Sequence, residues 1–149
     1  MSSGGTGEAG RRLVAFRIGR LVLKTILAGL FLFAAIAKLA DPAAFTQQIM
    51  NYQLVPWPVA ACMAVFLPAL EFCLGICLLL GRLESGALLW VTILLVAFSG
   101  ALLSAMVRGL AIDCGCFGRA METTGTIVPL IRNLGLLAVT AALWFSRRK

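Results

Sequence analysis

Four long runs of apolar residues divide the sequence, and shorter polar segments separate them. The runs cover approximately Leu21–Ala40, Val59–Leu80, Ala87–Val107 and Thr126–Phe145. Each is about 20 residues long, which is enough for a helix to cross the hydrocarbon core of a bilayer. Because lipid offers peptide groups no hydrogen-bond partner, each run is expected to be α-helical. The pattern predicts an all-α integral membrane protein, a four-transmembrane-helix bundle.

The connection between the first two runs, Asp41–Pro58, has a different pattern. It begins with an Asp-Pro pair, which is a helix-start signal. Phe45, Ile49 and Tyr52 then recur at helical spacing, with polar residues on the other faces. This predicts a short amphipathic outer helix on the membrane surface between spans 1 and 2. Such a helix either covers the bundle or forms a lid over a site below it.

Composition narrows the class of protein. Hydrophobic residues make up 61% of the chain and charged residues 13%, and the mean hydropathy is +1.00. A soluble domain of this size cannot bury so much apolar surface, so an ordinary soluble enzyme and a disordered chain are excluded. The expected organisation is a disordered cytoplasmic tail over residues 1–15, a membrane domain over residues 16–146 and a basic cytoplasmic tail over residues 147–149.

The net charge of +7 reflects where the basic residues lie. Eight of them flank the apolar runs at the two ends of the chain: Arg11, Arg12, Arg17, Arg20, Lys24, Arg147, Arg148 and Lys149. This is the pattern of charge that orients membrane proteins, so the expected partner is the lipid bilayer and no nucleic acid is expected. Positive-inside counting predicts cytoplasmic N- and C-termini in a bacterial inner membrane. The first and third connections then face the periplasm.

The first run has an alternative interpretation as a cleaved signal peptide. Basic residues precede its apolar core, and Ala35-Ile36-Ala37 resembles a cleavage site. Its length still allows a complete span if the Lys24 ammonium reaches the interface, which favours a retained helix. Either outcome leaves the orientation of the later spans unchanged.

The cysteines are the main candidates for chemistry, because the chain has five of them and no histidine. Cys114 and Cys116 flank Gly115 in the third connection, outside the cytoplasm, where disulfides persist. A turn at Gly115 would bring the two residues within disulfide range. So small a ring would be strained and easily reduced, which suits thiol–disulfide exchange better than scaffolding.

Neighbouring residues bear on the reactivity of this pair. The Asp113 carboxylate is expected to raise the pKa of the Cys114 thiol, whereas Arg108 and Arg119 would lower it if they fold back. Three interpretations of the pair remain: a thiol–disulfide exchange site, a site for a soft metal such as Cu(I) or Hg(II), and a purely structural loop.

The other cysteines lie in the second span. Cys62, Cys73 and Cys77 fall on one face of an ideal helix. They are either small apolar packing residues or a ladder of thiols. Cys62 is the best candidate for contact with the Cys114–Cys116 loop. The soft-metal alternative would use Cys73 and Cys77 together with the loop pair.

Charged residues inside the spans are the second group of candidates. Glu71 lies near the middle of the second span, where an unpaired carboxylate is costly and marks a functional site by default. Arg132 is its preferred partner, and Lys38 is the alternative if its side chain turns inward. The pair is either a salt bridge that fixes helix packing or part of a site for a proton or a polar ligand.

Taken together, these motifs resemble the methylamine-utilisation MauE family, within the wider DoxX-like group of redox-associated four-helix membrane proteins. The similarity extends over roughly Phe16 to Phe145. The most specific feature is the block Ile112-Asp113-Cys114-Gly115-Cys116-Phe117-Gly118 between spans three and four. The other matching residues are Lys38, Leu39, Asp41, Pro42, Phe45, Tyr52, Pro56, Pro68, Glu71 and Gly75.

The resemblance implies a membrane thiol–disulfide redox protein, or an accessory to one, that matures disulfide-rich periplasmic proteins beside a thioredoxin-like partner. Cys114 and Cys116 would be the catalytic pair. Analogy with other four-helix thiol oxidoreductases adds a membrane quinone as electron acceptor. The alternatives are a soft-metal binding or transport protein and a non-catalytic membrane assembly factor. The residues expected to support the site are Asp113, Gly115, Phe117, Glu71, Arg132, Lys38 and Cys62.

Overall fold

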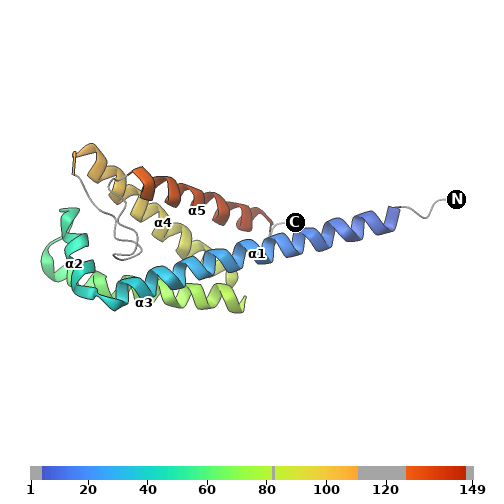
Figure 1. Ribbon diagram of the computed structural model, residues 1–149, viewed down its shortest axis with the longest axis horizontal. Coiled ribbons are helices and arrows are strands. Elements are labelled where there is room, and N and C mark those ends of the chain that lie inside the picture. Colours follow the sequence, from blue (N-terminus) through green and yellow to red (C-terminus); the bar gives the residue numbers. More distant parts are fainter. Residues whose placement is uncertain (1–4, 82, 111–126, 147–149) are drawn as a thin grey trace.

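A computed structural model gives the arrangement of the helices (Figure 1). It describes residues 5–81, 83–110 and 127–146, with side chains from residue 10 onward. Within these ranges the chain is all-helical and contains no strand. The helices are α1 (Gly5–Ala40), α2 (Pro42–Asn51), α3 (Trp57–Leu80), α4 (Glu84–Val107) and α5 (Ile127–Ser146). The predicted fold class is confirmed.

Four of these helices are long and apolar enough to cross a membrane: Gly10–Ala40 within α1, and the whole of α3, α4 and α5. The last three begin within three residues of the predicted starts. Their outward surfaces carry many exposed large apolar side chains, such as Phe66, Ile93 and Leu134. Those surfaces suit contact with lipid chains, and the protein is therefore a multi-pass membrane protein.

Helix α1 differs most from the expected boundaries. It has 36 residues and begins at Gly5, well before the predicted start at Leu21. At 1.5 Å per residue it is about 54 Å long, against about 30 Å of hydrocarbon. Its N-terminal part extends beyond the other helices (Figure 1). The helix thus continues through part of the segment expected to be a disordered tail.

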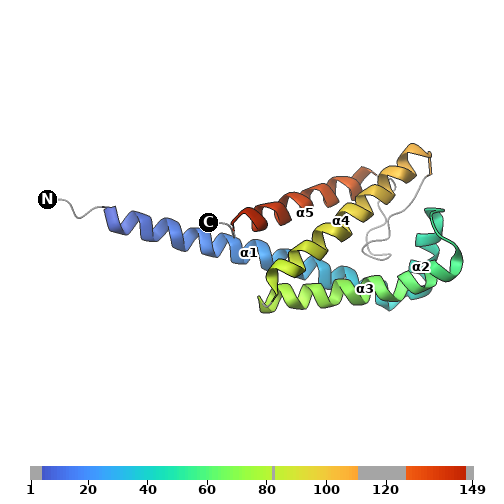
Figure 2. The ribbon, with the colours of Figure 1, turned by 180° about the vertical axis from the view of Figure 1, so that it is seen from behind.

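The bundle consists of two closely packed helix pairs, α1 with α3 and α4 with α5 (Figure 2). The core between them contains fully buried Leu27, Leu78, Leu88 and Val91. Helices α1 and α3 approach each other closely at Gly75. A Cβ atom added there would lie 2.7 Å from Leu32 Cγ and 3.2 Å from the Ala28 carbonyl oxygen.

The predicted outer helix is present as α2. The Asp41 carboxylate caps it by accepting a 2.9 Å hydrogen bond from the Ala44 N–H, and Pro42 occupies its first turn. Phe45 is buried, so this helix directs an aromatic ring toward the bundle. It ends at Asn51, and the chain enters α3 six residues later.

One side chain ties the end of α4 to the connection between α2 and α3. The Arg108 guanidinium donates to the Tyr52 carbonyl oxygen at 3.2 Å and to Gln53 Oε1 at 3.5 Å. Because Arg108 directly follows α4, these bonds hold the start of the third connection beside α2. At the other end of α4, the Arg20 guanidinium on α1 contacts the Glu84 carboxylate at 2.8 Å.

Candidate functional site

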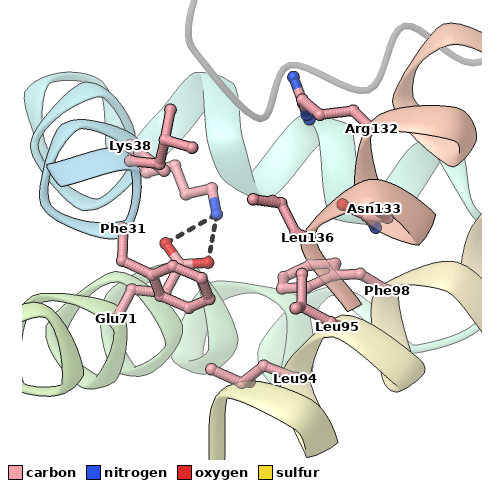
Figure 3. A pocket seen from close by; sticks show the side chains of 11 residues that line it. Phe31, Lys38, Glu71, Leu94, Leu95, Phe98, Arg132, Asn133 and Leu136 are labelled. Atoms are coloured by element: carbon pink, nitrogen blue, oxygen red, sulfur yellow. Dashed lines mark hydrogen bonds and ion pairs between the residues drawn. The ribbon is translucent and has the colours of Figure 1, made fainter. Parts of the chain in front are cut away.

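A buried ion pair joins α1 to α3. Lys38 Nζ lies 2.6 Å and 2.8 Å from the two carboxylate oxygens of Glu71, and each residue is only 4% exposed. Lys38 lies in the last turn of α1, and Glu71 lies near the middle of α3 (Figure 3). Burying one of these charges without a counter-charge would cost several kcal/mol, so each charged group is stabilised in the buried site by the other.

The expected partner of Glu71 is corrected by this geometry. The sequence favours Arg132 as this partner, whereas the ion pair formed by Glu71 is with Lys38. The close packing of α1 against α3 brings the lysine directly over the carboxylate. Figure 3 shows the Arg132 side chain, on α5, set apart from that carboxylate.

Two aromatic rings complete the surroundings of the ammonium group. Lys38 Nζ lies 5.2 Å from the centroid of the Phe45 ring and 5.0 Å from that of Phe98. Both distances are within the range of a cation–π interaction. Since Phe45 belongs to α2 and Phe98 to α4, the lysine contacts side chains from three other helices.

A small cavity of about 40 Å³ adjoins the ion pair. Lys38, Glu71, Arg132 and Asn133 supply its polar wall, and the remaining lining is apolar (Figure 3). The volume suits one or two water-sized groups. Two cations and one anion line it, so the formal charge of this polar centre is +1.

A second, larger cavity of about 160 Å³ lies between α2, α3 and α4. Its lining is mostly apolar and includes Phe45, Met63 and Ala101, while Leu94 and Phe98 line both cavities. Two polar side chains from the α2 region, Gln48 and Tyr52, also line it. Burial raises the pKa of the Tyr52 phenol above its ordinary value. The hydroxyl is protonated at neutral pH even at the ordinary tyrosine pKa of about 10.

Gln48 has an unusual environment. Its Oε1 atom is buried and has no hydrogen-bond partner in the described part of the chain. A buried acceptor of this kind costs about 1–3 kcal/mol when it stays unsatisfied. The neighbouring Gln47 is exposed, and its amide nitrogen donates to Asn51 Oδ1 at 3.3 Å.

The predicted catalytic pair, Cys114 and Cys116, lies outside the described residues, as do Asp113, Gly115 and Phe117. Their placement and roles stay predictions. The last described residue before them is Leu110, two residues after the Arg108 tether.

The cysteines of α3 are described, and they point largely outward. Cys62 and Cys73 are exposed, and Cys77 is partly buried; all three are free thiols. No group of three Cys, His, Asp or Glu side chains within the described ranges is arranged to hold a metal ion. The soft-metal alternative also uses Cys114 and Cys116, which lie outside the described residues, so it stays a prediction.

The sequence identifies the charged members of this site but not Phe98 or Gln48. Lys38, Glu71 and Arg132 stand out because charge is rare within apolar spans. Phe98 is one aromatic residue among many in the spans, and Gln48 looks like an ordinary residue on the polar face of a surface helix. Neither carries a signal that spacing alone reveals.

Comparison with known sequences finds a family model and several relatives that share one family name. The model of the family described as Methylamine utilisation protein MauE matches residues 17–146. The MauE protein of Paracoccus denitrificans is 31% identical over 122 residues, which cover 81% of this chain and 66% of the relative. MauE of Methylorubrum extorquens is 32% identical over 134 residues, covering 89% of this chain and 72% of the relative.

A third relative, MauE of Paracoccus versutus, is 32% identical over 118 residues, covering 78% of this chain and 63% of the relative. The chain thus spans about two thirds of the length of these proteins. No solved structure matches it.

Proposed function

Because this chain belongs to the MauE family of methylamine utilisation proteins, we propose that it is a membrane thiol–disulfide redox protein, or an accessory to one. It would act through Cys114 and Cys116 on proteins outside the cytoplasm. The observation that carries the proposal is the buried Lys38–Glu71 pair, whose ammonium group also contacts Phe45 of α2 and Phe98 of α4. Arg108, at the end of α4 that precedes the cysteine segment in the sequence, is bonded to the Tyr52 carbonyl oxygen after α2. Intramembrane charge of this kind is typical of functional sites.

The proposed chemistry is thiol–disulfide exchange. A thiolate of a client protein attacks one sulfur of the Cys114–Cys116 disulfide, which forms a mixed disulfide and releases the other cysteine as a thiolate. A second client thiolate then displaces the bound cysteine. The client leaves with a disulfide, and Cys114 and Cys116 are left as a dithiol. Two electrons and two protons thus pass from the client to this chain.

The polar centre would tune this exchange. Its formal charge of +1, from Lys38 and Arg132 against Glu71, favours a thiolate over a thiol in a nearby cysteine. Asp113 has the opposite effect on Cys114, so the two cysteines would differ in reactivity. That difference would decide which cysteine sulfur the client thiolate attacks and which cysteine is released as a thiolate.

Orientation and partners complete the proposal. With both termini in the cytoplasm of a bacterial inner membrane, the third connection faces the periplasm, where disulfides persist. The names of the relatives point to methylamine utilisation. The client would be a disulfide-rich periplasmic protein, and a thioredoxin-like protein would be the exchange partner.

Trapping of the mixed disulfide tests the proposed function. In cells producing Cys114→Ser or Cys116→Ser, the thiolate of the remaining cysteine can attack a disulfide of an oxidised client or exchange partner and form a mixed disulfide, with one partner cysteine leaving as a thiolate. We expect one of the two variants to accumulate this complex, which disappears on reduction, because the second cysteine of the pair that would release the bound protein is missing. The double variant is expected to form none. Cys77→Ser is the matched control, since this partly buried thiol lies within α3, and it should behave as the wild type.

Two outcomes would contradict the proposal. One is full client maturation by the double variant, which would indicate a non-catalytic assembly factor. The other is modification of Cys114 or Cys116 by a membrane-impermeant reagent from the cytoplasmic side only.

A further inference from the structure

The 160 Å³ cavity between α2, α3 and α4 has the size of a single six-membered ring with small substituents. For comparison, an apolar protein cavity of about 150 Å³ holds benzene. The Phe45 and Phe98 rings in its wall offer faces and edges for aromatic packing. Leu54 and Ala97 are lining residues that are also exposed, so the cavity borders the lipid-facing surface of the bundle. A ring inside could therefore carry an apolar tail that extends into lipid.

The Gln48 amide defines the polar chemistry of the ligand. Its buried, unpartnered oxygen calls for a donor such as a ring hydroxyl. An amide that rotates by half a turn presents N–H groups instead and can then donate to a ring carbonyl. The protonated Tyr52 hydroxyl is a second donor in the same lining. The site thus suits a ring oxygen that alternates between hydroxyl and carbonyl.

We infer that this cavity binds the head ring of a lipid-soluble quinone and its hydroquinone, with Gln48 as the principal polar contact. The inference rests on the proposed function, because the dithiol left after exchange must be reoxidised. The reaction is balanced by the quinone alone: two S–H bonds break, one S–S bond forms, and both quinone carbonyls become hydroxyl groups. Two electrons and two protons leave the cysteine pair, and the same number arrive on the ring.

The position of the cavity fits this role. Leu94 and Phe98 separate it from the polar centre that contains Lys38 and Glu71. Phe45 and Phe98, which contact the Lys38 ammonium, also line the ring site. A ring bound here would lie one side-chain layer away from the buried ion pair. It would also lie close to the α2 region to which Arg108 ties the end of α4.

Direct binding to the purified full-length chain in detergent tests the inference. Decylubiquinone is the probe, with its affinity measured by calorimetry and its position by photolabelling with an azidoquinone. We expect Gln48→Leu to weaken binding about tenfold or more, because the ring oxygen loses its partner. Ala101→Leu, which fills the cavity from α4, is expected to weaken binding as well. Gln47→Leu is the matched control and should leave the affinity unchanged, because Gln47 is exposed.

The possible outcomes distinguish specific binding of a quinone from binding of any apolar molecule of similar size. Decylbenzene, which lacks the ring oxygens, should compete far more weakly than the quinone. If it competes as well as the quinone, if both cavity variants bind as the wild type does, or if photolabel falls outside α2, α3 and α4, the inference is wrong. Failure of quinone binding with successful mixed-disulfide trapping would overturn this site alone. The opposite pair of results is quinone binding that depends on Gln48 together with full client maturation by the variant lacking both Cys114 and Cys116. This would retain the quinone site and overturn the redox function.

Discussion

Glu71→Gln is expected to destabilise the protein by about 3–5 kcal/mol, because it leaves the Lys38 ammonium buried without its counter-charge. The lysine is 4% exposed and has both carboxylate oxygens within 2.8 Å. Lys38→Met should cost a similar amount for the opposite reason, since the carboxylate then stays buried alone. Unfolding of the detergent-solubilised protein, followed by helix content or aggregation against temperature, measures both effects.

The double variant Lys38→Met/Glu71→Leu makes this prediction specific. Removing both charges removes the desolvation penalty as well, so stability should return close to that of the wild type. Arg20→Met provides a matched control, because Arg20 also forms a 2.8 Å ion pair from α1 but is one-third exposed. Its loss is expected to cost about 1 kcal/mol or less.

Two results would contradict the assignment of Lys38 and Glu71 as a charged pair. The first is a neutral effect of Glu71→Gln, and the second is a double variant no more stable than either single one. A double variant that is stable but fails to mature the client would show that the polar centre serves function. A double variant that is both stable and active would restrict the pair to helix packing.

The sequence was sufficient to predict the fold because lipid imposes helices on any apolar span. The starts of α3, α4 and α5 follow from where apolar residues begin. The start of α1 does not, because a helix can continue into a basic segment that leaves the membrane. Nothing in the apolar pattern marks where such a helix ends.

The candidate site was only partly predictable, for a physical reason. Charge within a span identifies Lys38, Glu71 and Arg132, but the choice of partner depends on which helices pack together. The α1–α3 contact decided in favour of Lys38. The cavity beside Gln48 depends on unfilled volume between three helices, which is a property of their packing and leaves no pattern in the sequence.

That α1–α3 contact depends on Gly75, and Gly75→Ala should destabilise the protein by about 1–3 kcal/mol. The added Cβ would lie 2.7 Å from Leu32 Cγ and 2.9 Å from Leu32 Cδ2, and 3.2 Å from the Ala28 carbonyl oxygen. A change of rotamer at Leu32 could relieve the side-chain clash, but the carbonyl belongs to the backbone of α1, so that contact is relieved only if the helices separate. Separation would also pull Lys38 away from Glu71, four residues before Gly75.

Gly100→Ala on α4 is the matched control, since a Cβ added there has no atom within 4 Å. This substitution should leave stability unchanged or raise it by up to about 1 kcal/mol, because alanine favours a helix more than glycine does. In a Leu32→Ala background the cost of Gly75→Ala should fall, since the closest clashing atoms are gone. Thermal unfolding of these variants in the same detergent measures all the effects. Equal stability of Gly75→Ala and Gly100→Ala would show that α1 and α3 do not approach each other as closely as this contact requires.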